Sequence, residues 1–328
     1  MNFEEKIFEV TNHSFNSLCI EVFNFQYQNN TIYQQYCNAT GILPKNIATI
    51  EQIPFFPITF FKTHQVKTTS FIEQGIFESS GTTQNINSKH FIKDTELYKR
   101  SFTNNFTQFY GPVKEWCIIG LLPSYLEKGN SSLVTMVDDL IKQTNNKNSG
   151  FYLYDTEKLY SILIENEVKK QPTLVIGVTY ALLDFAEKYK MNLRYTTVME
   201  TGGMKGRREE ISRQEVHTIL QKELGVTHIH SEYGMTELLS QAYSKKDGLF
   251  YCPNWMKVLI REEDDPFELV ATPLAKKSGL INVIDLANLY SCSFIATDDI
   301  GKLNTNGSFE VLGRKDNSDL RGCSLLTV

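Results

Sequence analysis

The sequence lacks the features of a secreted, metal-stapled or membrane-spanning protein. Its six cysteines are scattered over 328 residues, with no C-x-x-C pair and no histidines beside them at ligand spacing. Neither a disulfide framework nor a zinc site is therefore expected. The first residues, MNFEEKIFEV, are acidic and do not show the basic and then apolar pattern of a secretory signal. Because no apolar run approaches the roughly 20 residues of a membrane span, we expect a cytoplasmic protein without such a span.

The chain also has no excess of basic residues. It contains 33 Lys and Arg residues against 38 Asp and Glu residues, a formal net charge of −5. Nucleic acid is therefore not expected as the main partner, since neutralising phosphates requires a basic surface. The length permits one large α/β unit or two smaller domains, each with a substantial core.

Apolar periodicity predicts an α/β organisation. Helical spacing dominates residues 3–38, and from about residue 94 helical and strand-like stretches alternate. The strand-like stretches include WCIIGLL, FYLYD, TLVIGV and YTTVME. Such alternation is typical of a mainly parallel sheet with helices on its faces. After about residue 250, short apolar runs separated by turn residues predict a β-rich, antiparallel part.

Small hydroxyl residues surround one glycine in the stretch ESSGTTQ. They are Ser79, Ser80, Gly81, Thr82 and Thr83. A glycine lets the backbone approach an anion closely, and N–H groups and hydroxyls can converge on phosphate oxygens. The spacing is not that of a Walker P-loop. On composition alone, a polar surface turn is the favoured interpretation of the stretch.

The stretch HIHSEYGMTELL places a strand-like run before a glycine turn, which is where α/β sheets usually bind ligands. Tyr233, which precedes Gly234, could stack on the flat ring of a nucleotide base. Thr236 could bond a phosphate, and Glu237 could hold Mg²⁺ through oxygen. The alternative is an apolar helix that begins at Thr236 with Glu237 in its first turn.

Two further polar turns follow, TDDIG and GRKD. Paired aspartates can accept hydrogen bonds from ribose hydroxyls, and an arginine after a glycine can reach a ribose or a phosphate. Each turn alone is more often a solvated loop.

Taken in this order, ESSGTTQ, YGMTE, TDDIG and GRKD resemble the motifs of the adenylate-forming superfamily of acyl-CoA synthetases, luciferase and peptide-synthetase adenylation domains. IPFFPITFFKTHQV, METGGMKGRREE and the terminal RGCSL resemble the LuxE-type acyl-protein synthetases specifically. The resemblance implies the α/β large-domain fold of that superfamily over residues 1–312, with a β-rich subdomain from about residue 250. Residues 313–328 would form a hinge remnant and an acyl-carrying tail, without the usual small C-terminal lid domain.

The resemblance also implies a site for ATP and Mg²⁺. The family roles that it transfers are a phosphate loop at Ser79, Ser80, Gly81, Thr82 and Thr83, a strand end beside adenine at Gly202 and Gly203, an adenine-stacking Tyr233 before Gly234, an α-phosphate contact at Thr236, a Mg²⁺ ligand at Glu237, a ribose contact at Asp299 and a hinge arginine at Arg314.

One expected group is missing from this pattern, the lysine of the lid domain. Lys205, Arg207 and Arg208 are the candidates to replace its charge, and a solvated basic turn is the alternative interpretation. The family resemblance further makes Cys323 the thiol that receives the acyl group.

These features lead to one main functional hypothesis. The chain is expected to be an ATP-dependent acyl-protein ligase that activates a fatty acid or another carboxylate, loads it on Cys323 and passes it to an acyl reductase. An acyl-CoA-type ligase and a nucleotide-binding, non-catalytic subunit of a reductase complex are the alternatives.

Overall fold

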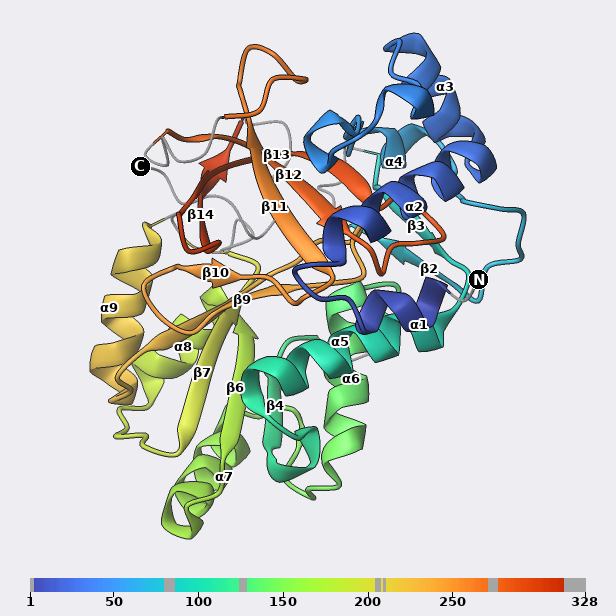
Figure 1. Cartoon of the computed structure of the whole chain (residues 1–328). Coiled ribbons are helices and arrows are strands. Elements are labelled where there is room, and N and C mark those ends of the chain that lie inside the picture. Colours follow the sequence, from blue (N-terminus) through green and yellow to red (C-terminus); the bar gives the residue numbers. More distant parts are fainter. Residues whose placement is uncertain are drawn as a thin grey trace. The chain divides into compact units, whose positions relative to one another are not determined.

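A computed structural model describes residues 3–79, 86–123, 129–203, 208, 211–270 and 277–315 of the chain (Figure 1). The chain divides into two units, each built from several segments. Unit 1 comprises Met1–Asn105, Met235–Gln241 and Tyr251–Val311. Unit 2 comprises Phe106–Gly234, Ala242–Phe250 and Leu312–Val328.

Unit 1 combines N-terminal helices with antiparallel strands. Its helices are α1 (Phe3–Phe8), α2 (Phe15–Asn29), α3 (Thr31–Ala39), α4 (Phe60–Thr63) and the first part of α5 (Thr95–Tyr110). Its strands are β1 (Phe56–Pro57), β2 (Gly75–Glu78), β3 (Lys89–Ile92), β11 (Met256–Arg261), β12 (Gly279–Asp285), β13 (Phe294–Leu303) and the first half of β14 (Phe309–Arg314). The expected helices over residues 3–38 are thus confirmed.

The C-terminal strands of unit 1 form the predicted antiparallel part. β12 lies between β11 and β13, and β1 pairs with β13 in parallel. Aromatic side chains fill the core that these strands share with α2 and α3. Phe294 on β13 contacts both Phe23 and Tyr33, with ring centroids 6.3 Å and 6.4 Å apart. Tyr33 in turn meets Phe56 at 5.9 Å, so β1 is fixed by the same cluster.

Unit 2 is the predicted parallel α/β part. Its strands are β4 (Cys117–Leu121), β5 (Gly150–Phe151), β6 (Thr173–Val178), β7 (Thr196–Thr201), β8 (Ile229–Tyr233), β9 (Ala242–Ser244) and the start of β10 (Phe250–Tyr251). Its helices are α6 (Ser132–Thr144), α7 (Thr156–Lys169), α8 (Thr179–Lys188) and α9 (Arg213–Leu224). The strand order is β9-β8-β7-β6-β4-β5, parallel except for β9.

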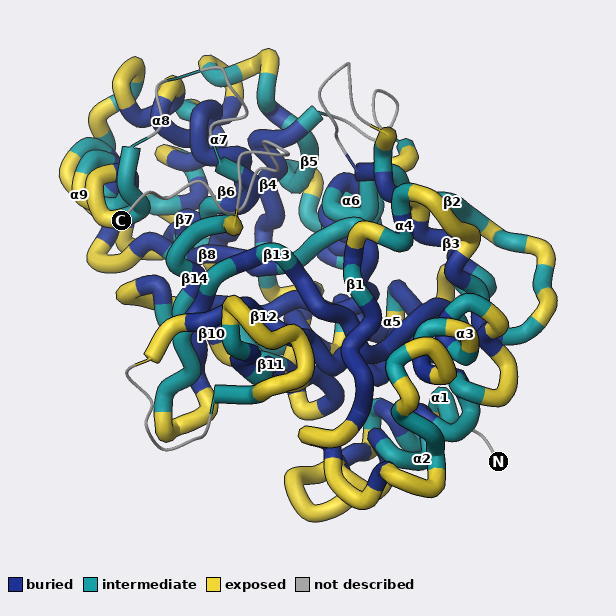
Figure 2. The backbone as a smooth tube through the Cα atoms, turned by 90° about the horizontal axis from the view of Figure 1, so that it is seen from above, coloured by how far each residue is buried: buried dark blue, intermediate teal, exposed yellow. Residues whose placement is uncertain are grey.

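Burial explains why the parallel strands were visible in the sequence. Every residue of β4 and β6 is buried, which matches the continuous apolar runs of a sheet covered on both faces (Figure 2). With this strand order, the general rule of right-handed crossovers would put α6 on one face of the sheet and α7, α8 and α9 on the other. α9 begins at Ser212, which forms a capping box with Glu215, and ends at Gly225 in the left-handed region.

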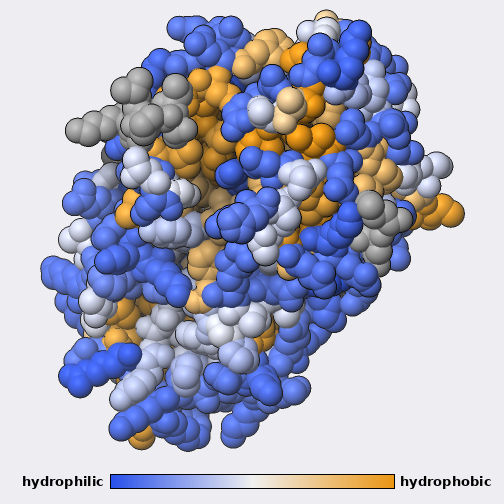
Figure 3. All heavy atoms as spheres, in the orientation of Figure 1, coloured by the Kyte–Doolittle hydropathy of each residue, from blue (hydrophilic) through white to orange (hydrophobic). Residues whose placement is uncertain are grey.

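One strand is shorter than the sequence predicts. The strand expected over residues 151–155 is only Gly150–Phe151, because the chain turns at Tyr152 and Asp155 caps α7. Within the described part of the chain, no helix is long and apolar enough to cross a bilayer. Figure 3 shows a mostly hydrophilic face with a hydrophobic hollow.

Candidate functional site

The stretch predicted as a phosphate loop connects the two strands of a hairpin in unit 1. β2 and β3 pair antiparallel, with Glu78 opposite Lys89. The next two residues close the neck of the connection, because Ser79 N–H donates to the Ser88 carbonyl (3.1 Å) and Ser88 N–H donates to Ser79 Oγ (2.9 Å). Both serines are buried. Ser80, Gly81, Thr82 and Thr83 lie outside the described residues.

The segment after Gly234 is not the helix that the alternative interpretation expected. It is a turn followed by irregular chain up to Gln241. The reason lies 45 residues away in sequence, where the Asp285 carboxylate accepts hydrogen bonds from Leu239 N–H (2.8 Å), Ser240 N–H (2.9 Å) and Ser240 Oγ (2.6 Å). Backbone donors that a helix would use internally are thus bound by one buried carboxylate, and the helix start is corrected to a side-chain-anchored turn.

Two further buried side chains hold Thr236 and Glu237 by their carbonyl groups. His90 Nδ1 lies 2.8 Å from the Thr236 carbonyl, and Asn288 Nδ2 donates to the Glu237 carbonyl at 2.7 Å. Burial lowers the pKa of His90, although the Thr236 carbonyl and the Glu237 charge oppose that shift. A neutral imidazole that meets a carbonyl carries its proton on Nδ1, since the carbonyl can only accept.

Glu237 has the character that a Mg²⁺ ligand needs. Its side chain is fully buried, and a carboxylate removed from water requires compensating positive charge or donors. Among the residues that the structure describes, no three His, Cys, Asp or Glu side chains cluster as a metal cage. Proteins usually hold Mg²⁺ through one or two carboxylates together with substrate phosphates and waters, and the carboxylate of Glu237 could serve as one such ligand.

The two aspartates of TDDIG point to different faces of β13. Asp299 is buried, whereas Asp298 is partly exposed and acts on the buried guanidinium of Arg261. Burial lowers the pKa of Arg261, and the charge of Asp298 opposes this. Arg261 also donates to the Thr297 carbonyl (2.6 Å), the residue before Asp298.

We expect Asp299→Ala to weaken ATP binding more than Asp298→Ala. A lost charge-assisted hydrogen bond to a ribose hydroxyl costs about 1.5–3 kcal/mol, whereas loss of Asp298 affects mainly Arg261. Calorimetric titration of both variants with ATP measures the difference. Equal affinities, or a larger loss at Asp298, would reverse the assignment.

Unit 2 holds the residues predicted to surround adenine. β7 and β8 are parallel neighbours, so their carboxyl ends lie at the same sheet edge. Gly202 and Gly203 follow β7 with φ values of +78° and +60°, a conformation that favours glycine. Tyr233 ends β8 and precedes Gly234; its ring is buried, 6.0 Å from the Phe250 ring.

A largely buried group of charged residues, each side chain 12–16% exposed, was missed in the sequence at these strand ends. Glu200 on β7 lies 3.6 Å from Arg213 Nε and 3.7 Å from His217 Nε2, both on α9. Burial alone would raise the pKa of Glu200, but His217 and Arg213 together hold it below its ordinary value. The only sequence signal was a glutamate inside each of the strands TTVMET and IHSEY.

The second of these glutamates, Glu232, lies beside Thr201. Thr201 Oγ1 donates to Glu232 Oε2 at 2.6 Å. Burial raises the pKa of Glu232 to about 7, with the nearby Glu200 adding to the shift and the Thr201 hydrogen bond opposing it. Near neutral pH this side chain is therefore poised between its two protonation states.

Glu232→Gln should make the protein more stable at pH 8 and leave it nearly unchanged at pH 4. A carboxyl whose pKa rises on folding stabilises the fold while it is protonated, and this contribution is lost as pH rises from the ordinary pKa of 4.5 to about 7. The neutral amide keeps an acceptor for Thr201, so the gain at pH 8 is up to about 3 kcal/mol. Urea unfolding at both pH values measures it, with the exposed Glu157→Gln as control. Equal stabilities at pH 8 would contradict the prediction.

Of the three basic residues predicted to replace the lid-domain lysine, the structure describes only Arg208. Arg208 pairs with Asp184 and Glu187 on α8, so its charge has acidic partners within unit 2. Lys205, Arg207 and Cys323 lie outside the described residues. Arg314 ends β14 and is partly exposed.

Almost the whole chain matches one protein family. The family model of the LuxE acyl-protein synthetases matches residues 5–327. The long-chain-fatty-acid–luciferin-component ligase of Aliivibrio fischeri is 23% identical over 353 residues, which cover 98% of this chain and 90% of the ligase.

Solved structures show the fold. A 2-hydroxyisobutyryl-CoA ligase in the postadenylation state, in complex with 2-HIB-AMP, aligns with a TM-score of 0.61 at 10% identity, over 95% of this chain and 70% of its own. O-succinylbenzoate coenzyme A synthetase from Bacillus subtilis, in complex with ATP and magnesium ion, aligns with a TM-score of 0.50 at 17% identity, over 73% and 49%. The chain spans about half the length of that synthetase and of the ATP-bound MatB from Rhodopseudomonas palustris (47%). The expected large-domain fold of adenylate-forming enzymes is thus confirmed, and the chain belongs to the LuxE family of acyl-protein synthetases.

Proposed function

We propose that the protein is an ATP-dependent acyl-protein ligase that activates a fatty acid as its acyl-adenylate and then forms a thioester on its own Cys323. The observation that carries the proposal lies in unit 1. There the hairpin with the predicted phosphate loop is hydrogen-bonded, through His90, to the turn with Thr236 and Glu237. The family match supports the same chemistry.

The first step is substitution at the α-phosphorus of ATP. A carboxylate oxygen of the fatty acid forms a bond to this phosphorus, the bond from the α-phosphorus to the bridging oxygen breaks, and pyrophosphate leaves with the electron pair. Thr236 would bond an α-phosphate oxygen, and Asp299 would bind the ribose. Glu237 would hold Mg²⁺, which when bound neutralises phosphate charge.

The second step is acyl transfer to a thiol. The Cys323 thiolate would attack the acyl carbon of the mixed anhydride, and AMP would leave through its phosphate oxygen. The cysteines within the described residues are poor candidates. Cys19, Cys37, Cys117 and Cys292 are buried, and burial raises the pKa of each thiol. Cys252 is only partly exposed, and burial raises its pKa to about 12.

The partner and the location belong to the same proposal. The relative in Aliivibrio fischeri is named for a fatty acid and a luciferin component. A thioester on a protein is chemically suited to reduction to an aldehyde, so we infer an acyl reductase as the acceptor and the cytoplasm as the location. Candidate carboxylates are long-chain fatty acids.

The test is fatty-acid-dependent exchange of labelled pyrophosphate into ATP, followed by analysis of label from the fatty acid. We expect exchange, and a protein-bound label that forms without CoA. A free CoA thioester as the main product would favour an acyl-CoA ligase instead. Absence of exchange with fatty acids and short carboxylates alike would favour a nucleotide-binding, non-catalytic subunit.

A further inference from the structure

His90 joins the β2–β3 hairpin of unit 1 to the turn at Thr236. It is on β3, two residues after Ser88, which closes the neck of the β2–β3 connection with Ser79. Its side chain is 1% exposed. No motif in the sequence singles it out.

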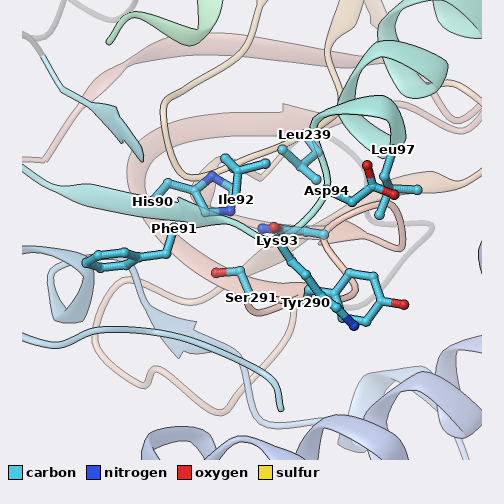
Figure 4. A pocket seen from close by; sticks show the side chains of 10 residues that line it. His90, Phe91, Ile92, Lys93, Asp94, Leu97, Leu239, Tyr290 and Ser291 are labelled. Carbon is cyan, nitrogen blue, oxygen red and sulfur yellow. The ribbon is translucent and has the colours of Figure 1, made fainter. Parts of the chain in front are cut away.

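The imidazole ring of His90 is held in one orientation. Nδ1 donates to the Thr236 carbonyl at 2.8 Å, and the Phe61 ring stands edge-on at 5.9 Å. Figure 4 shows the ring of His90 directed into a small cavity that Leu239 also lines. A buried ring with a fixed donor can hold a backbone group in place, because a carbonyl taken from it would be left without a partner inside the protein.

The other side of the same turn is held by further side chains, one of which, Asn288, also interacts with His90. Asn288 holds the Glu237 carbonyl, and Asp285 holds the amides of Leu239 and Ser240. Both come from the β12–β13 connection or its edge, whereas His90 comes from the β2–β3 hairpin. The turn is therefore bonded to two separate parts of unit 1, and His90 supplies the bond to the hairpin.

We propose that His90 is a positioning residue for adenylation, whose Nδ1–H···O=C bond to Thr236 sets the β2–β3 hairpin against the turn that carries Thr236 and Glu237. This inference rests on the proposed function, since it assigns phosphate binding to the hairpin and metal binding to the turn. His90 itself touches no substrate in this scheme. It acts through the main chain, at the Thr236 carbonyl that it holds and at β3 on which it lies.

The experiment compares two amide substitutions that differ only in where they place a donor. The side-chain amide of His90→Asn falls near the position of Nδ1, whereas that of His90→Gln lies one bond farther out, nearer to Nε2. His90→Leu removes the donor. His230→Leu is the matched control, because the ring of His230 contacts the Tyr110 hydroxyl (3.1 Å) within unit 2.

Three properties are measured on the full chain: thermal unfolding, calorimetric binding of ATP with and without Mg²⁺ in the absence of fatty acid, and hydrogen exchange of the amides of Ser88–His90 and Leu238–Ser240. Kinetics of pyrophosphate exchange give kcat and the KM for ATP. We expect His90→Gln and His90→Leu to weaken Mg²⁺-dependent ATP binding about tenfold and to lose amide protection in both segments. His90→Asn should recover most of both, and His230→Leu should change neither.

Three outcomes would overturn the inference. They are wild-type ATP binding in His90→Gln, an equal loss in His90→Asn and His90→Gln, and an equal loss in His230→Leu. If His90→Leu does not fold, the comparison of His90→Asn with His90→Gln still decides. Failure of the proposed function would be distinguishable, because the wild-type protein itself would then show no exchange.

Discussion

Glu237→Gln should abolish fatty-acid-dependent pyrophosphate exchange while the protein stays folded. Glutamine is almost the same size as glutamate and keeps one acceptor oxygen, so packing in this buried position is preserved. The lost negative charge is what a bound Mg²⁺ requires, and phosphoryl transfer depends on that charge neutralisation. We expect exchange to fall by at least about 100-fold, in the range seen when a transition-state-stabilising group is removed.

The measurement varies Mg²⁺ concentration at saturating ATP, with thermal unfolding as the test of folding. Glu262→Gln is the control, since this glutamate of unit 1 pairs with Lys277 at the surface. The control should behave as the wild type. A Glu237→Gln protein with wild-type exchange at limiting Mg²⁺ would remove Glu237 from the metal site.

The fold of unit 2 could be predicted from local sequence patterns, because the different local signals in each of its elements agree. β6 is a continuous apolar run between turn residues, and α9 has both a capping box and a terminal glycine. In such elements propensity, capping and burial agree, so the pattern alone predicts the structure. The strand predicted over residues 151–155 was too long, because local signals disagree there. Its last residue, Asp155, caps the next helix and ends the extended chain.

The candidate site was predictable only in its motifs. The turn at Thr236 has a sequence that suits a helix start, and it is set instead by Asp285 and His90, which are distant in sequence. Hydrophobic periodicity cannot reveal such long-range side-chain-to-backbone bonds. Glu200 and Glu232 were missed because buried charges interrupt apolar strands without indicating their partners.

Cys323 defines the second expected result, which concerns acyl transfer and not adenylation. With ATP and labelled fatty acid, the wild-type protein should acquire a hydroxylamine-sensitive label, and Cys323→Ser should acquire none. A chain truncated after Arg321 should behave as the serine variant does. Pyrophosphate exchange should be normal in both, because the adenylate forms before the thiol acts.

The chemical reason is that the other described cysteines form thiolate less readily. Acyl transfer requires thiolate, and burial raises the pKa of every cysteine within the described ranges. Cys323 follows Arg321 by two residues, and a neighbouring positive charge favours thiolate. Cys252→Ser is the matched control, because Cys252 is the most accessible of the described cysteines. If the thioester label survives in Cys323→Ser but disappears in Cys252→Ser, the acceptor is Cys252. If the label survives in both single variants, Cys292 is the next cysteine to test.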